Sequence, residues 1–185
     1  DCLTRVPMII RVPGGAAGHV VREPIEAMDM MATVLELTGI MPRHTHFSRS
    51  LVPQIKGAAG DPQRAVFADG GYDMHEPHCF ENWPGRAAIA ATPEAIYYPK
   101  IKQQHDFPES VCRAAMIRTL EYKLIRRTQG VSELYDLTRD PRELRNVYDD
   151  AAHRAAQVQL EHRLLEHYLH TSDTVPMNDD PRGFS

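Results

Sequence analysis

The chain has 185 residues, of which 42% are hydrophobic, enough apolar side chains for one larger domain or two small ones. Its formal net charge of −4 argues against a nucleic-acid-binding or polybasic membrane role. No apolar run approaches the roughly 18 residues that a membrane-spanning helix needs. The three cysteines, Cys2, Cys79 and Cys112, are widely spaced and odd in number, which favours free thiols in a reducing compartment. We therefore expect a soluble, cytoplasmic globular protein.

The first third of the chain predicts a strand and a helix. Residues 6–12 form an apolar, β-branched run with Pro7 near its start and Pro13 directly after it, which is typical of a strand buried on both faces of a parallel sheet. Helical spacing follows, with an apolar stripe at Met28, Met31, Ala32 and Leu35. We expect Asp29 to cap this helix or to lie on the surface, and Gly39 to end it.

A short amphipathic piece at residues 51–55 precedes a run of turn-forming residues at 57–62. We place a domain boundary there, between a first part at residues 1–60 and a second at residues 61–170. Residues 171–185 form a polar tail.

The second part predicts an antiparallel meander and a long helix. Strand-like runs occupy residues 65–68, 116–119, 122–126 and 133–136, and turn signals separate the last three. Between residues 87 and 112 we expect a loop with short helical pieces. Residues 151–170 predict the long helix, with Leu160, Leu164 and Tyr168 on one stripe and Val158, Leu165 and Leu169 beside it.

Several of these segments, taken in order, resemble the C-terminal part of a sulfatase of the arylsulfatase-like group, in the alkaline-phosphatase-like superfamily. They are RVPMIIRVPG, MDMMATVLELTGI, SRSLVPQIKG, MIRTLEYKLI and ELYDLTRDPRELRNV, and together they span residues 5–148. The last is the most specific. Ala32 stands where the family often has proline, a departure at the helix start and away from the chemistry.

The resemblance implies an α/β fold class. The chain would hold the last strand and helix of the catalytic α/β sheet, then an α+β subdomain with a small antiparallel sheet and a long C-terminal helix. It also implies a parent enzyme that hydrolyses sulfuric esters, using a formylglycine made from Cys or Ser and a divalent metal, calcium or magnesium. Both would lie before the Arg-Val-Pro strand, as would any signal peptide.

The residues themselves agree with that expectation. None of the three cysteines is followed by proline or alanine and arginine at the spacing that a formylglycine precursor needs. No acidic cluster has the spacing expected for a calcium or magnesium site. We therefore predict no catalytic residue, no metal ligand and no cofactor in this segment, which would be inactive alone. Its partners would be the remainder of the catalytic domain and, in the parent, a sulfate ester.

Two other functions stay open. The parent could be a phosphate or phosphonate monoester hydrolase of the same superfamily, which the upstream coding sequence would decide. The chain could also be a non-catalytic interaction module. An unpaired apolar strand at residues 6–12 would expose backbone N–H and C=O groups that can pair with another chain, so we expect the isolated chain to self-associate.

The loop at residues 70–86 is the candidate substrate-binding segment, because loops of the C-terminal subdomain reach the reaction centre in the resembled family. There His75 and His78 could donate hydrogen bonds to a sulfate or hydroxyl, Tyr72 and Trp83 could stack, and Arg86 could pair with an anion. An ordinary surface loop is the plain alternative.

A zinc site is a second interpretation of the same loop. Its ligands would be His75, His78 and Cys79 together with Asp73 or His105. Structural zinc sites usually have two separated ligand pairs, and neither the pair His44 and His46 nor any other supplies a convincing second one.

Two further charged groups predict solvated faces. Arg118, Lys123, Arg126 and Arg127 on the meander could instead form an anion-binding patch. The final helix carries His153, His162, His167 and His170 among Glu161 and Glu166, a surface that could also face the missing domain or another subunit.

Overall fold

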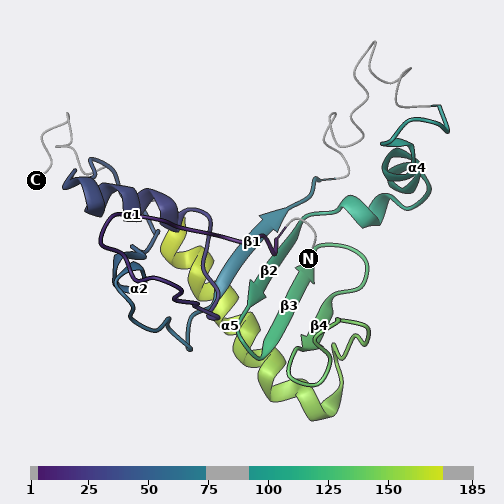
Figure 1. The fold of residues 1–185 in the computed structure, drawn as a ribbon. Helices are drawn as coiled ribbons and strands as arrows, with labels where there is room; N and C mark the ends of the chain where they lie inside the picture. Colours follow the sequence, from purple (N-terminus) through teal and green to yellow (C-terminus); the bar gives the residue numbers. More distant parts are fainter. Residues whose placement is uncertain (1–3, 74–91, 173–185) are drawn as a thin grey trace, which may run out of the picture. The chain divides into compact units, whose positions relative to one another are not determined.

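The structure is a computed structural model that describes residues 4–73 and 92–172 (Figure 1). The chain forms two compact units. The first comprises Asp1–Phe67, Arg118–Glu121 and Val158–Ser185, and the second comprises Ala68–Ile117 and Tyr122–Gln157. The domain boundary that the sequence predicts at residue 60 stays a prediction. No described helix combines the length and the apolar character needed to cross a membrane.

The first unit contains the helices α1 (Asp29–Thr38) and α2 (Val52–Ile55). Gly39 ends α1 as predicted: it has φ 68°, and its N–H donates to the carbonyls of Glu36 and Leu35. Both helices are joined through Thr33, whose hydroxyl donates to the Asp29 carbonyl at 2.6 Å and accepts the Leu51 N–H at 2.9 Å. The predicted helix and the short amphipathic piece are thus confirmed.

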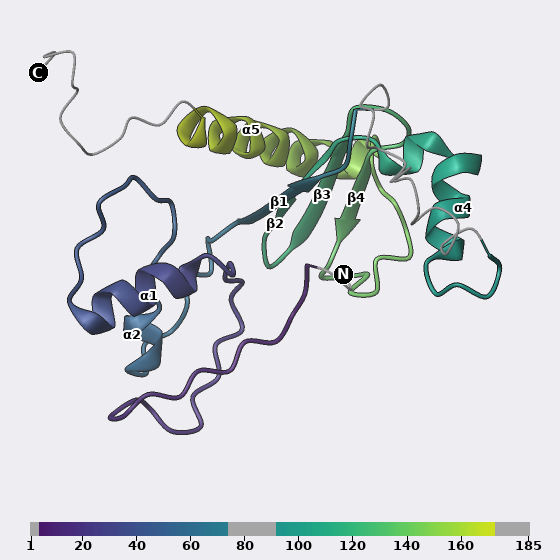
Figure 2. The ribbon, with the colours of Figure 1, turned by 90° about the horizontal axis from the view of Figure 1, so that it is seen from above.

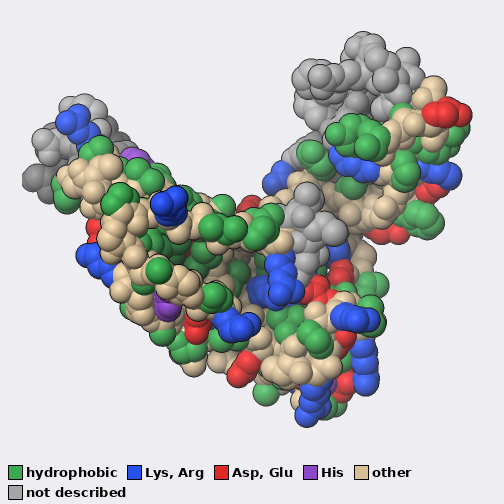
Figure 3. Space-filling model, viewed as in Figure 1, with side chains coloured by type: hydrophobic (Ala, Val, Ile, Leu, Met, Phe, Trp, Pro, Cys, Tyr) green, Lys and Arg blue, Asp and Glu red, His purple; other side chains and the backbone are tan. Residues whose placement is uncertain are grey.

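α1 buries two polar residues and exposes several apolar ones, unlike an ordinary surface helix. Its buried side includes the polar residues Asp29 and Thr33. Its exposed side carries apolar residues at helical spacing, namely Met30, Val34 and Leu37, and hydrophobic side chains are visible at the surface in this region (Figure 3). A helix of this kind has an apolar stripe that the described residues leave in solvent.

The strand predicted at residues 6–12 is not formed. The segment joins no β-ladder among the described residues, and the side chain of Ile9 is 94% exposed. A strand exists only through hydrogen bonds to a neighbour, and the described sheet is built from later parts of the chain. An apolar run therefore did not suffice to make a strand here.

The sheet has four strands in the order β1-β2-β3-β4, side by side in Figures 1 and 2. Their bounds are Val66–Gly70, Ala114–Arg118, Tyr122–Arg127 and Glu133–Asp136. β3 and β4 pair antiparallel, with Tyr122 opposite Asp136. Ile117, Leu124 and Leu134 are fully buried, one from each of the last three strands. The predicted meander is confirmed, to within two residues at each strand end.

Helices precede β2 and follow β4 in the sequence. α4 (Tyr98–Asp106) and the 3₁₀ helix η1 (Pro108–Val111) precede β2, where only short helical pieces were expected. The 3₁₀ helix η2 (Ala151–His153) leads into the long helix α5 (Arg154–Thr171), which confirms the predicted C-terminal helix. Of its two apolar stripes, Leu160 and Leu164 are buried, whereas Leu165 and Leu169 are exposed.

Candidate functional site

The first unit is organised around a buried carboxylate, Asp29. It is the first residue of α1 and is completely inaccessible to solvent. Its Oδ1 accepts the Arg49 N–H at 2.8 Å, and its Oδ2 accepts the Glu26 N–H at 2.9 Å and lies 2.7 Å from Arg64 Nη2. Met28 holds the N-cap position instead. The expectation that Asp29 caps the helix or lies on the surface is therefore wrong.

The charge of Asp29 is stabilised by its donors. Burial alone would raise the pKa of this carboxyl, but the hydrogen bonds from Arg64 and from the Arg49 and Glu26 amides outweigh it and hold the pKa below its ordinary value. Glu26 adds a second carboxylate, which lies 3.3 Å from Arg64 and accepts the Phe67 N–H at 3.0 Å. The Asp29–Arg64–Glu26 anchor thus ties α1 to the segment before α2 and to the start of β1.

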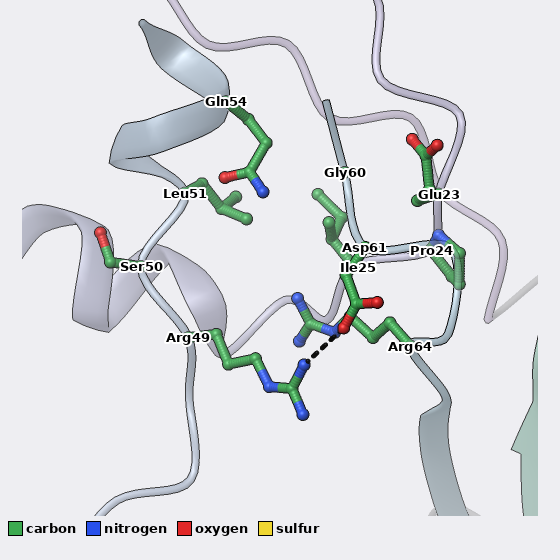
Figure 4. Close-up of a pocket in the computed structure, with 10 residues that line it drawn as sticks. All are labelled: Glu23, Pro24, Ile25, Arg49, Ser50, Leu51, Gln54, Gly60, Asp61 and Arg64. Carbon is green, nitrogen blue, oxygen red and sulfur yellow. Dashed lines mark hydrogen bonds and ion pairs between the residues drawn. The ribbon is translucent and has the colours of Figure 1, made fainter. Parts of the chain in front are cut away.

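A small cavity adjoins this anchor (Figure 4). It has a volume of about 90 Å³ and is lined by Glu23, Pro24, Ile25, Arg49, Ser50, Leu51, Gln54, Gly60, Asp61 and Arg64. Ligand pockets usually span about 300–1,000 Å³, so this α2 cavity is too small for a sugar or an aryl ester. Its only basic residues, Arg49 and Arg64, are paired with carboxylates. It is not a substrate site.

Of the five predicted substrate-binding residues, the structure describes Tyr72. Its side chain is exposed, and its N–H donates to the Val111 carbonyl at 2.8 Å. The backbones of Tyr72 and Cys112 form an isolated β-bridge. The preceding Gly71 has φ 85°, and a Cβ there would overlap the Cys112 carbonyl oxygen, so only glycine fits. The other four lie outside the described residues: His75, His78, Trp83 and Arg86.

The zinc interpretation is equally untested in its main part, because His75, His78 and Cys79 lie outside the described residues. His44 and His46 pack edge to face with their ring centroids 6.1 Å apart, and Nδ1 of His46 hydrogen-bonds to the Ser48 hydroxyl at 2.9 Å. In the part of the chain that the structure describes, no three His, Cys, Asp or Glu residues are grouped so that they could hold a metal ion.

The basic residues of the meander are engaged with acidic and polar partners. Lys123 is 5% exposed, and its Nζ lies 2.7 Å from Glu143. Arg127 donates to Glu133 from Nε at 3.0 Å and from Nη2 at 2.7 Å. A solvated face was predicted, and for Lys123 that prediction is wrong because an acidic partner from the loop after β4 compensates its charge.

Tyr135 extends the cluster around Glu133 by donating to Oε2 of that residue at 2.6 Å. Burial and this hydrogen bond raise the pKa of Tyr135, since its phenolate would face the Glu133 carboxylate. Burial would raise the pKa of Glu133 too, but the donors Tyr135 and Arg127 lower it overall. The cluster is a charge-balanced support for the sheet.

The histidines near the C-terminus have different surroundings. His153 is mostly buried, with Nε2 3.6 Å from Asp136 and Nδ1 3.7 Å from Asp150. His167 stacks on Phe67 with a centroid distance of 3.7 Å. His162 is exposed beside Glu166, at 3.5 Å. The predicted mixed-charge surface holds for His162, whereas His153 and His167 pack inside.

The motif ELYDLTRDPRELRNV has a structural explanation in its polar side chains. Asn146 accepts the Leu134 N–H at 2.9 Å and donates to the Ser132 carbonyl at 3.0 Å, extending β4 with a side chain. Asp136 accepts the Thr138 N–H at 3.0 Å, and Asp140 accepts the Leu144 N–H at 2.7 Å. These side chains accept hydrogen bonds from backbone N–H groups in the turns. The motif therefore stabilises the fold, and we assign it no reacting group.

Residues 88–170 match the family described as N-sulphoglucosamine sulphohydrolase, C-terminal. Over this segment the chain is similar to the C-terminal region of a sulfatase. The match covers α4, the strands β2, β3 and β4, and nearly all of α5. It includes two of the five resembling segments, MIRTLEYKLI and ELYDLTRDPRELRNV. A comparison with curated proteins gave no match.

Several solved structures share the fold. The phosphonate monoester hydrolase SpPMH from Silicibacter pomeroyi is 26% identical, with 88% of this chain and 28% of that chain covered and a TM-score of 0.62. The phosphonate monoester hydrolase of Agrobacterium radiobacter is 23% identical over 79% of this chain and 25% of that one, with a TM-score of 0.55. BT4656, solved with its substrate D-glucosamine-2-N,6-O-disulfate, is 21% identical over 82% and 25%, with a TM-score of 0.53. The chain thus spans about a quarter of the length of these proteins.

Proposed function

We propose that the chain is the C-terminal portion of a sulfuric ester hydrolase, inactive alone, which completes the fold of the parent enzyme and forms part of its substrate pocket. The match of residues 88–170 to a sulfatase C-terminal family is the observation that supports this most. The parent's other regions would supply the reacting groups, because the Asp29–Arg64–Glu26 anchor and the Glu133 cluster are engaged in structural ion pairs, and the α2 cavity is small.

The parent's metal and formylglycine would also come from outside this chain. A hard divalent cation needs about six to eight oxygen ligands, and the described residues offer no acidic group that fits such a site. Asp29 and Glu26 already share Arg64, and Glu133 is bound by Arg127 and Tyr135. We derive no reaction step for these residues.

A phosphonate monoester hydrolase is the second candidate for the parent. The two phosphonate monoester hydrolases named above have higher TM-scores than the sulfated-sugar enzyme, and SpPMH has the highest identity of the three. The two parents would differ in their nucleophile and leaving group, which lie in the region that this chain does not span. A non-catalytic module is the third candidate.

The substrate-side contribution would come from the loop that begins at Tyr72. Its aromatic ring is exposed at the end of β1, and the loop sequence adds His75, His78, Trp83 and Arg86. In the parent, replacing Trp83 with alanine would raise KM several-fold while kcat changes less, if the indole stacks on the substrate. Equal KM values for the variant and the wild type would remove this role.

The apolar stripe of α1 supports the proposed partner, the remainder of the catalytic domain. Met30, Val34 and Leu37 are each at least one-third exposed, which favours burial against another apolar surface. When that surface is missing, the same stripe would drive copies of the isolated chain to associate.

An activity assay separates these functions. The full parent and this 185-residue chain would each be given a chromogenic aryl sulfate, an aryl phosphate and an aryl phosphonate monoester, with added calcium. Sulfate turnover by the parent alone supports the main proposal. Preferred phosphonate or phosphate turnover identifies the second candidate. Turnover by the isolated chain would contradict the proposal that it is inactive, and a parent gene without a catalytic region would leave the interaction module.

A further inference from the structure

Methionine is concentrated in α1 and at its two ends. Four of the chain's eight methionines fall within residues 28–41, and each has 36–81% of its surface exposed: Met28, Met30, Met31 and Met41. Met116 on β2 is the contrasting case, because only 9% of its surface is exposed. The four residues of this α1 methionine cluster therefore meet solvent, whereas Met116 is packed into the sheet.

The cluster lies beside the apolar stripe of α1. Residues three and four positions apart share one side of a helix, so Met30 and Met31 each lie one turn from Val34. Val34 in turn precedes Leu37 by three positions. Methionine is apolar and flexible, which suits a surface that packs against a partner. The state of these sulfurs therefore decides how apolar the stripe is.

The thioether sulfur of an exposed methionine reacts with peroxides. The sulfur lone pair attacks one peroxide oxygen, the O–O bond breaks, an S–O bond forms, and hydrogen peroxide leaves as water. The sulfur loses two electrons and the peroxide gains them. The product, a sulfoxide, is a polar group that accepts hydrogen bonds from water, so burying it against an apolar surface is costly.

We propose that the α1 methionine cluster is an oxidation site that weakens association through the apolar stripe. Peroxide would place sulfoxides at Met30 and Met31, one turn from Val34, and these groups would lose their hydration on docking. A dithiol can return the thioether, becoming a disulfide as the sulfoxide oxygen leaves as water. The inference rests on the docking role proposed for the stripe. In the parent the remainder of the catalytic domain would cover the cluster, so oxidation would act only while the stripe is uncovered.

The rates of oxidation test whether the cluster is accessible. The 185-residue chain, diluted to limit association, would be treated with hydrogen peroxide, and peptide mass spectrometry would measure the sulfoxide at each methionine. We expect the four cluster methionines to be oxidised at least several-fold faster than Met116, and this difference to vanish in urea. Equal rates in the folded chain would overturn the proposal.

Light scattering tests what oxidation does to association. At a concentration where the untreated chain associates, the oxidised chain should shift toward monomer. Methionine sulfoxide reductases with a dithiol should reverse the shift, and the dithiol alone should not. The matched control replaces all four cluster methionines with leucine, which keeps the apolar surface but has no thioether. This variant should associate and should not respond to peroxide. A response would place the effect at another group and would overturn the proposal.

Two outcomes separate this proposal from the docking role on which it rests. A monomeric untreated chain would overturn the docking role and the oxidation switch together. An associated chain whose size is unchanged after all four cluster methionines are oxidised would overturn the switch alone. If the leucine variant does not fold, the untreated, oxidised and reduced wild-type samples still decide, because reversal that needs the reductases identifies methionine as the oxidised group.

Discussion

Arg64 and Asp29 form a buried ion pair, with Nη2 2.7 Å from Oδ2 and both side chains at least nine-tenths buried. Arg49 and Asp61 form a second Arg–Asp pair nearby in the same unit, at 3.2 Å, with both side chains about half exposed. Because the residue types are the same and burial differs, the two pairs allow a matched comparison of what burial does to an ion pair.

Asp29→Asn should destabilise the chain far more than Asp61→Asn. The first change leaves the buried guanidinium with only Glu26 as its counter-charge, and breaking a buried pair typically costs about 3–5 kcal/mol. The second breaks an exposed pair, typically worth less than about 1 kcal/mol. At position 61 Asn keeps an acceptor for the Gln63 N–H, whereas at position 29 it can accept from only one of the two backbone donors, Arg49 and Glu26. Urea unfolding monitored by circular dichroism measures both differences, and equal values would mean that the buried pair is not the anchor.

Acid should weaken the folded chain through the same carboxylate. The pKa of Asp29 is lower in the folded state than its ordinary value of 3.8, so its contribution to stability is complete above that value and is lost as the pH falls through the folded-state pKa. Glu133 and Asp136 act in the same direction, since their donors also lower their pKa. Unfolding midpoints measured from pH 6 to pH 2 should therefore fall, and should fall less steeply in Asp29→Asn.

Gly71→Ala should destabilise the second unit, whereas Gly70→Ala should have little effect. At Gly71 the backbone is left-handed and a methyl group would overlap the Cys112 carbonyl, but at Gly70 nothing lies within 4 Å of an added Cβ. Left-handed strain alone costs about 1–3 kcal/mol. Hydrogen exchange at the Tyr72 amide, which donates to Val111, should accelerate only in the Gly71 variant. Similar exchange in both variants would contradict the close approach.

Tyr135 should resist ionisation because Glu133 stands beside its hydroxyl. The difference between the ultraviolet pH titrations of the wild type and Tyr135→Phe isolates this one phenol, and its midpoint should lie well above the ordinary tyrosine value of 10.0. Glu133→Gln removes the negative charge and should move that midpoint down. A midpoint that does not respond to Glu133→Gln would mean that burial alone governs the phenol.

The isolated chain should self-associate through α1. Leu37→Lys places a charge at the C-terminal end of the apolar stripe and should shift the chain toward monomer in multi-angle light scattering. Leu144→Lys is the control, because Leu144 is also exposed but belongs to the loop after β4 in the second unit. A monomeric wild type, or an equal response to both substitutions, would contradict association through this stripe.

The sequence correctly predicted the helices and strands whose formation depends mainly on neighbouring residues. The Gly39 stop, the strands of the meander and the C-terminal helix depend on turn chemistry and on apolar periodicity, both of which are visible in sequence. The strand at residues 6–12 failed because a strand also needs a neighbour, which a run of apolar residues does not specify.

The buried charges could not be predicted in the same way. Asp29 and Lys123 have the sequence context of surface residues, and both are buried because distant partners, Arg64 and Glu143, compensate them. Of the candidate substrate residues, the structure describes Tyr72, so the rest of that loop stays a prediction.

The Tyr72–Cys112 bridge brings together the two ends of a long excursion of the chain. The backbone leaves the end of β1 and returns to the start of β2 at one place, pinned by the Tyr72–Val111 hydrogen bond and by the fit of Gly71 against Cys112. We therefore expect the sheet to tolerate replacement of residues between these two points. Relatives could differ in what they recognise by carrying a different segment here while the meander stays the same. A foreign loop could likewise be grafted between Tyr72 and Cys112.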